Sequence, residues 1–209
     1  MVDIIDVGMG NICSIRNNLS RLGIGCRIVS DPKELSSHTI ILPGVGSARP
    51  FMNQIRARNF DHAINNHLAQ GNTIVGICLG FQVMTKFSEE DGGVTCLGLI
   101  ETETIPLKRF YTPSNHNQWE PFLLRKDQLC LSKGHTSILK SRRRIIKGRV
   151  FYNHEYGVKL PNNKKYFQSI NTTDLASFAS MYCKDNIIGI QFHPEKSQLT
   201  GLEVLSFLL

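Results

Sequence analysis

The sequence predicts an α/β fold: a largely parallel central sheet flanked by helices, with additional antiparallel strands in the second half. Two observations predict this fold. In the first half, short apolar runs alternate with segments of helical period, an order that is typical of a parallel sheet covered on both faces. In the second half, strand-like runs follow one another without helices between them. A chain of 209 residues is long enough for a full hydrophobic core.

The first half contains four expected strands, at residues 2–7, 26–29, 39–42 and 73–77. Apolar side chains at helical spacing predict a helix over residues 12–22 and part of a second helix over residues 61–68. A third helix is expected to begin just after Cys78. Because the carboxyl ends of parallel strands meet at one edge of a sheet, Cys78 and the turns at residues 8–11 and 43–46 are expected to converge on one crevice.

The second half is less regular. Strand-like runs occupy residues 97–107, 149–152, 177–183 and 187–192, and a helical pattern returns at residues 201–209. The sequence has no internal repeat, low-complexity segment or linker. Residues 1–209 are therefore expected to form a single domain.

The composition predicts a soluble globular protein and excludes several other classes. No stretch of about 18 apolar residues suggests a membrane span, and the N-terminus lacks the basic start of a signal peptide. Six cysteines are scattered without a Cys-x-x-Cys pair, and the seven histidines lack metal-ligand spacing, so neither a metal site nor a disulfide-stapled fold is expected. These features favour the reducing cytoplasm, which would keep the cysteines free.

The net charge of +7 comes partly from a dense basic run at residues 140–149. We interpret this run first as a solvated hairpin or loop edge. The alternative is a patch that binds phosphate or an acidic partner surface. Nucleic acid is not expected as a partner, because aromatic residues are not interleaved with the charges.

Residues 76–80, Gly-Ile-Cys-Leu-Gly, are the most informative stretch of the chain. They follow an apolar strand, and small residues on both sides of Cys78 allow a tight turn from strand to helix. Such a turn is a nucleophile elbow, which lifts the side chain clear of the backbone. The start of the following helix would favour the thiolate form. On this stretch alone, a buried cysteine that only packs is an equally good interpretation.

His193 and Glu195 favour the catalytic interpretation. A thiol nucleophile needs a base that accepts its proton and later protonates the leaving amine, and histidine suits this role near neutral pH. In an extended segment residues i and i+2 face the same side, so Glu195 can orient the ring. This set predicts attack of a thiolate on an acyl group, with the side-chain amide of glutamine as the favoured substrate. Alone, His193 would be interpreted as an ordinary strand-end residue.

Residues 43–46, Pro-Gly-Val-Gly, are a candidate oxyanion hole. Glycines allow the backbone N–H groups of Gly44, Val45 and Gly46 to turn toward a developing negative oxygen. The N–H group of Leu79 would be the other donor. Residues 8–10 do not complete a dinucleotide fingerprint, since a cysteine occupies the third glycine position, so no cofactor is expected.

These motifs resemble the class I (triad) glutamine amidotransferases nearly end to end and, within that class, the glutaminase subunits of imidazole glycerol phosphate synthase. The segments that carry the resemblance are residues 6–11, 42–46, 76–82 and 191–197. The resemblance implies hydrolysis of glutamine to glutamate and ammonia through a thioester on Cys78, with His193 as acid and base and Glu195 orienting it. It also implies a heterodimer with a separate (β/α)₈-barrel cyclase subunit, which receives the ammonia for histidine biosynthesis.

The same resemblance implies two further groups of residues. The glutamine head group would be held by Gln82 and Glu90, with backbone help near His154, Glu155 and Tyr156. The interface with the cyclase would include Asn11, Trp119 and Lys196.

Two segments depart from the subfamily pattern. Residues 115–120 read Asn-His-Asn-Gln-Trp-Glu where Pro-His-Met-Gly-Trp-Asn is usual, and residues 152–156 read Tyr-Asn-His-Glu-Tyr where Phe-Val-His-Ser-Tyr is usual. Glu155 thus places a carboxylate beside a site for a zwitterionic amino acid. The alternatives are a paralogous subunit that supplies ammonia for sugar amidation in surface-polysaccharide biosynthesis, a cysteine hydrolase that acts alone on peptides or small amides, and a non-catalytic partner-binding subunit.

Overall fold

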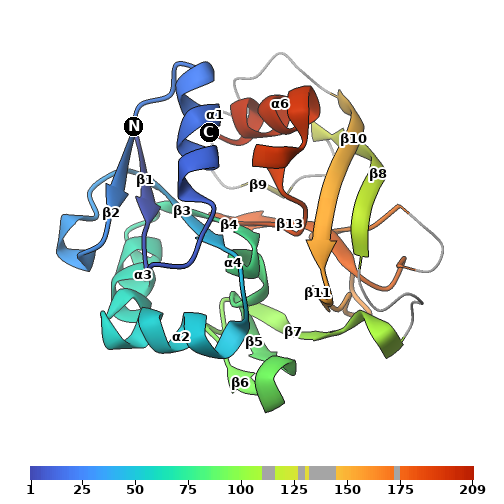
Figure 1. Cartoon of the computed structure of the whole chain (residues 1–209), viewed down its shortest axis with the longest axis horizontal. Helices are drawn as coiled ribbons and strands as arrows, with labels where there is room; N and C mark the ends of the chain where they lie inside the picture. Colours follow the sequence, from blue (N-terminus) through green and yellow to red (C-terminus); the bar gives the residue numbers. More distant parts are fainter. Residues whose placement is uncertain (110–115, 127–129, 132–144, 172–174) are drawn as a thin grey trace.

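A mixed sheet lies at the centre of the molecule (Figure 1). The computed structural model describes residues 1–109, 116–126, 130–131, 145–171 and 175–209. The strands of the sheet follow the order β12–β13–β14–β4–β3–β1–β2, and β9 pairs with β13. Their bounds are β1 (Val2–Ile5), β2 (Cys26–Val29), β3 (Thr39–Gly44), β4 (Thr73–Cys78), β9 (Cys130–Leu131), β12 (Phe167–Ser169), β13 (Ala179–Asp185) and β14 (Ile187–Ile190).

Parallel pairing dominates this sheet. Five adjacent strands are parallel to one another, in the order β14, β4, β3, β1 and β2. On the other side of β14, strand β13 is antiparallel to β14, and β12 is antiparallel to β13. The predicted fold class is confirmed, including the antiparallel strands of the second half. Strand β14 pairs with β4, so the chain segment after β14 reaches the same edge of the sheet as the segments after β3 and β4.

Helices cover both faces of the sheet because alternate side chains of its strands are apolar. In β1, Ile4 packs on the face covered by α1 and α6, whereas the adjacent Ile5 packs on the face covered by α2 and α3. The helices are α1 (Ile12–Arg21), α2 (Ala48–Ala57), α3 (Phe60–Ala69), α4 (Leu79–Gln82) and α6 (Gln198–Leu208). Short 3-10 helices are η1 (Pro32–Glu34), η2 (Glu90–Gly92), η3 (Leu107–Arg109) and η5 (Pro194–Lys196). Within the described residues, no helix combines the length and the apolar character needed to cross a membrane.

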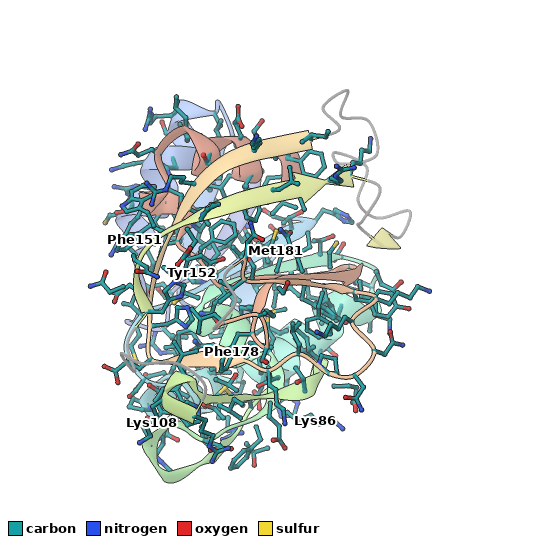
Figure 2. The ribbon with its side chains drawn as sticks, turned by 90° about the vertical axis from the view of Figure 1, so that its right-hand side faces the viewer. Lys86, Lys108, Phe151, Tyr152, Phe178 and Met181 are labelled. Carbon is teal, nitrogen blue, oxygen red and sulfur yellow. The ribbon has the colours of Figure 1, made fainter. Side chains whose placement is uncertain are left out.

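Two smaller groups of strands complete the fold. One is a sheet in the order β11–β7–β5–β6, formed by β5 (Thr85–Ser88), β6 (Val94–Thr95), β7 (Ile100–Pro106) and β11 (Tyr156–Val158). The other is a long antiparallel ribbon formed by β8 (His116–Arg125) and β10 (Ile145–His154). Figure 2 shows this ribbon above the central sheet, with Tyr152 on the side that faces the sheet. The Tyr152 hydroxyl lies 2.7 Å from the Ser180 hydroxyl of β13, which ties the ribbon to the sheet.

Several boundaries differ from the sequence-based expectations. Strands β3 and β4 each extend beyond their expected ends, because Pro43 pairs with Ile77 and Gly44 with Cys78. The strand expected at residues 149–152 is the centre of the much longer β10. The strand expected at 97–107 begins only at Ile100. Helix α2 was not predicted, although its buried residues have the i, i+3, i+4, i+7 spacing of an amphipathic helix; they are Ala48, Phe51, Met52 and Ile55.

Candidate active site

Cys78 occupies a strained turn between β4 and α4. Its φ of 53° and ψ of −110° lie in a region that a residue with a side chain rarely adopts. A Cβ atom at position 76 would lie 2.2 Å from the Met84 sulfur, and one at position 80 would lie 1.8 Å from the Leu42 carbonyl oxygen. Both glycines are therefore required by the close packing of the elbow, as the sequence predicted.

His193 lies beside Cys78 because β14 pairs with β4. Its Nδ1 atom lies 2.8 Å from Glu195 Oε1, and the exposed fractions of the two side chains are 3% and 1%. The predicted contact is confirmed, but Glu195 reaches the ring from the 3-10 helix η5 rather than from an extended segment. The His193 backbone is fixed on both sides: its N–H donates to the Phe151 carbonyl, and its carbonyl accepts from the Ser197 hydroxyl.

The charge state of His193 follows from its neighbours. Burial disfavours the charged ring, but the charge of Cys78, a hydrogen bond with Cys78 and the carboxylate of Glu195 outweigh burial and raise the pKa of His193 to about 10. The site therefore holds an imidazolium beside the sulfur at neutral pH. An imidazolium in this position is ready to protonate a leaving amine.

Two amide side chains surround the Cys78–His193–Glu195 set. Gln191 is fully buried, and its Nε2 atom donates toward Cys78 Sγ at 3.9 Å. Asn11 Nδ2 donates to Glu195 Oε1 at 3.1 Å, so the structure places a residue expected at a partner interface against the carboxylate of this set. Sequence reasoning missed Gln191; the available signal was its position two residues before His193 at the end of the same apolar run.

A pocket of about 120 Å³ opens beside Cys78 and His193. Its other lining residues are Val45, Gly46, Leu79, Gln82, Glu90, Asn153, His154, Glu155, Tyr156 and Lys196. The pocket thus brings together every residue that the sequence suggested for glutamine binding, and most of the suggested oxyanion hole. Gly44 is close by, because it pairs with Cys78 across β3 and β4. Among the suggested interface residues, Lys196 lines this pocket, whereas Trp119 lines a separate groove.

Gln82 has a defined orientation in this pocket. Its Nε2 atom donates to the Tyr156 carbonyl at 2.6 Å and to Gln191 Oε1 at 3.3 Å. These two acceptors use both protons of the amide nitrogen. The side-chain oxygen of Gln82 is then the atom that this residue can offer to a donor group of a substrate.

Carboxylates give the pocket a negative character. Glu90 accepts a hydrogen bond of 2.8 Å from the Ala48 N–H at the start of α2. Burial, with smaller contributions from the charges of Asp91 and Glu155, outweighs that hydrogen bond and raises the pKa of Glu90 to about 7. The exposed side chain of Glu155 lies on the rim. Such a pocket favours a ligand that carries an ammonium group.

Metal-ligand geometry is not found in the part of the chain that the structure describes: no group of three or more His, Cys, Asp or Glu side chains there could hold an ion. Residues 140–144 of the basic run lie outside the described residues.

Comparison with known proteins gives three consistent results. A family model described as "Glutamine amidotransferase class-I" matches residues 3–206. The curated protein "Imidazole glycerol phosphate synthase subunit HisH 2" of Methanococcus maripaludis is 34% identical over 98% of this chain and 96% of that protein. The subunit HisH of the same synthase from Geobacillus thermodenitrificans is 32% identical over 99% of this chain and 93% of that protein.

Solved structures agree with this fold. One titled "Crystal structure of glutamine amidotransferase" matches with a TM-score of 0.70 and 14% identity, and covers 98% of this chain and 96% of that chain. PurLQS from Thermotoga maritima matches with a TM-score of 0.69 and 17% identity, and covers 99% of this chain and 96% of that chain. At such identities these two matches concern the fold alone.

Proposed function

This chain belongs to the class I glutamine amidotransferases, and on that premise we propose that it is the glutaminase subunit of an imidazole glycerol phosphate synthase, which supplies ammonia for histidine biosynthesis. One observation carries the proposal: Cys78, His193 and Glu195 meet beside a single pocket with the residues suggested for glutamine binding. The full-length similarity to HisH subunits supports the same conclusion.

Hydrolysis begins with the formation of a thioester. The Cys78 thiolate attacks the side-chain carbonyl carbon of glutamine, and the negative charge moves to the carbonyl oxygen. Backbone N–H groups of residues 44–46 and of Leu79 stabilise that oxyanion. The tetrahedral intermediate then collapses: the C–N bond breaks, and the proton of the His193 imidazolium goes to the leaving nitrogen, which departs as ammonia.

A second step releases glutamate. Neutral His193 accepts a proton from a water molecule whose oxygen attacks the thioester carbon. The C–S bond breaks, Cys78 leaves as a thiolate, and His193 is again an imidazolium. Glu195 orients the ring and stabilises its charge in both steps, and Asn11 holds the Glu195 carboxylate through Oε1.

We assign roles in glutamine binding to the residues of this pocket. The side-chain oxygen of Gln82 accepts from a donor group of the substrate, and ionised Glu90 attracts its ammonium group. His154, Glu155 and Tyr156 also line the pocket. No cofactor takes part in this mechanism.

We infer that the partner is a separate cyclase subunit of the (β/α)₈-barrel type, in a heterodimer that passes ammonia between its subunits. The relatives are named as subunits of a synthase, which supports a partner. Trp119 packs on Phe151 and borders a groove of about 380 Å³ beside the exposed Leu199. We assign Trp119, Lys196 and Asn11 to the interface. The cytoplasm is the proposed compartment, because it keeps Cys78 reduced.

A second candidate function rests on the departures from the subfamily pattern. Gln118 and Glu120 lie on β8, and Glu155 lies on the pocket rim, so a paralogous subunit could use the same chemistry to supply ammonia for sugar amidation. The assembled Cys78, His193 and Glu195 disfavour a non-catalytic subunit. A cysteine hydrolase that acts alone would need no partner.

The test measures glutamate formed from glutamine by the purified chain, alone and with its cyclase subunit. We expect strong stimulation by the partner. Cys78→Ser should abolish glutamate formation while partner binding persists, and Cys13→Ser, a change at an exposed cysteine, should leave turnover unchanged. Persistent hydrolysis in Cys78→Ser would disprove the role of Cys78. Stimulation by a sugar-amidating partner but not by the histidine-pathway cyclase would favour the second candidate.

A further inference from the structure

Three buried side chains link the ribbon to the glutamine pocket through consecutive hydrogen-bonded contacts. Glu120 Oε1 lies 3.1 Å from His116 Nε2, and His116 Nδ1 lies 3.2 Å from His154 Nε2. His154 Nδ1 then lies 2.7 Å from the Tyr156 carbonyl oxygen. The side chains of His116 and Glu120 are 0% and 6% exposed. We call Glu120, His116 and His154 the relay.

The pairing of β8 with β10 places these residues together. His116 lies directly opposite His154 in the antiparallel register, and directly opposed side chains of such strands are neighbours. Glu120 lies four residues after His116 and therefore on the same face of β8. The His116 ring stacks on Tyr152, with ring centroids 4.6 Å apart. The ribbon thus holds the relay at a fixed geometry.

The contacts determine where the protons lie. A carbonyl oxygen can only accept, so His154 carries its proton on Nδ1. Burial and the nearby rings of His116 and His193 lower the pKa of His154 to about 3, so this ring is neutral and its Nε2 atom accepts. His116 must then carry a proton on Nδ1. The remaining contact, between His116 Nε2 and Glu120, requires one more proton shared by the two groups.

The last member of the relay, His154, contacts the Tyr156 carbonyl oxygen. This oxygen also accepts a hydrogen bond from Gln82 Nε2. Together with Gln191 Oε1, this carbonyl fixes which end of the Gln82 amide faces the pocket. If it moved away, the Gln82 amide could turn, and its nitrogen would face the substrate in place of its oxygen. This exchange would place a donor where the proposed binding mode needs an acceptor.

We propose that the relay positions the glutamine pocket. It sets the tautomer of His154, which holds the Tyr156 carbonyl, and the carbonyl orients Gln82. Relay members act through other residues, so they are positioning residues. The inference rests on the proposed function, because it assumes that glutamine occupies this pocket. By this proposal Glu120, a buried carboxylate that does not line the pocket, also affects substrate affinity.

The effect of the relay belongs mainly to binding. Cys78 is fixed by the glycine-dependent elbow, and His193 is fixed by its backbone contacts with Phe151 and Ser197. Neither arrangement passes through the relay. Loss of the relay should therefore raise the KM for glutamine more than it lowers kcat.

The experiment compares two substitutions at Glu120 in the complex with the cyclase. Glu120→Leu removes the proton shared with His116. The KM for glutamine should rise about tenfold, because roughly one hydrogen bond is lost. The kcat should stay within about twofold of the wild-type value. Glu120→Gln should restore KM to within about twofold, because an amide N–H can donate to His116 Nε2. A folded Glu120→Leu variant with an unchanged KM would overturn the proposal.

A control and a second measurement keep the test decisive. Leu124→Ala removes a buried side chain from the same ribbon without touching the relay, so it should lower Tm and leave KM unchanged; a matching rise in KM would reduce the relay to a structural role. In the wild-type chain, ¹⁵N NMR should show neutral His154 protonated on Nδ1 between pH 5 and 8. The Nε2–H tautomer would overturn the proposal, and this readout is independent of whether the chain hydrolyses glutamine.

Discussion

Single residues of the site owe their chemistry to their surroundings. His193 is buried, which by itself would keep its ring neutral, yet its contacts with Cys78 and Glu195 reverse that effect. Cys78 is held at a positive φ that the chain tolerates only because its neighbours at positions 76 and 80 lack a Cβ atom. The reactive pair is therefore maintained by packing as well as by charge.

The raised pKa of His193 predicts how stability depends on pH. In the unfolded chain this histidine loses its proton near its ordinary pKa of 6.5, and in the folded chain only near 10. Between these values the folded state binds one proton more than the unfolded state. The stabilisation of the fold by the charged His193 ring is therefore complete below pH 6.5 and is lost as the pH rises toward 10.

Thermal unfolding at a series of pH values between 6.5 and 10 measures this contribution. The Tm of the wild-type chain should fall more steeply over that range than the Tm of His193→Asn. The same variant should hydrolyse glutamine slower by about two orders of magnitude, the usual value of general acid–base help. Parallel Tm profiles in the two proteins would show that His193 is not charged in the folded state.

Whole elements bring the site residues together, and the sequence predicts these elements unevenly. Strands β1, β3 and β4 and helix α1 were predictable, because strands covered on both faces read as apolar runs and α1 has a clear helical period. Strand β8 was not, because two of its buried positions carry the polar residues His116 and Glu120. Their burial makes sense only when β10 supplies His154 across the ribbon.

The candidate catalytic residues were more predictable than the residues that hold them in place. The motif around Cys78 and the His193–Glu195 pair suggest their chemistry from residue types and spacing alone. The contacts of Asn11 with Glu195 and of Gln191 with Cys78 depend on which strands and loops are neighbours. No local pattern encodes a contact between residues so far apart in the sequence.

The packing of α6 on η5 yields a prediction about the carboxylate of the site. Gly201 of α6 lies so close to η5 that a Cβ atom would be 1.8 Å from the Pro194 carbonyl oxygen. Gly201→Ala should push α6 away from η5, displace Glu195, lower kcat, and destabilise the fold by about 1–3 kcal/mol, the usual cost of overpacking.

Chemical denaturation and steady-state kinetics of Gly201→Ala measure both effects. The matched control is Gly25→Ala, since a Cβ atom there would have only the Met1 sulfur nearby, at 3.9 Å. It should change neither quantity appreciably. If Gly201→Ala kept wild-type kcat and stability, the position of Glu195 would not depend on α6.

At the scale of the whole molecule, the central sheet separates two apolar cores. Cys78 lies at the edge of the sheet where β3, β4 and β14 end. The ribbon closes one side of that edge and carries Trp119 and Phe151 on the face opposite the relay. The His154 side chain, which lines the pocket, and the Trp119 side chain, which is assigned to partner contact, therefore lie on opposite faces of the same ribbon.

This division predicts the behaviour of Trp119→Ala. The partner should stimulate glutamine hydrolysis less in this variant, whereas the KM for glutamine should change by less than about twofold, because the substituted side chain faces away from the pocket. Titration of the cyclase during steady-state turnover measures both quantities. Ile145→Ala, which removes an exposed side chain from the far end of β10, is the control. A raised KM with unimpaired stimulation would remove Trp119 from the interface.

The pairing of β4 with β14 has a consequence for how the protein is made. Gln191 and Cys78 touch although they are 113 positions apart, and contacts across so long a loop form late in folding. A ribosome releases Cys78, the proposed nucleophile, long before His193, the histidine proposed to activate it. During synthesis Cys78 therefore lacks its contact with Gln191, which forms only when β14 pairs with β4.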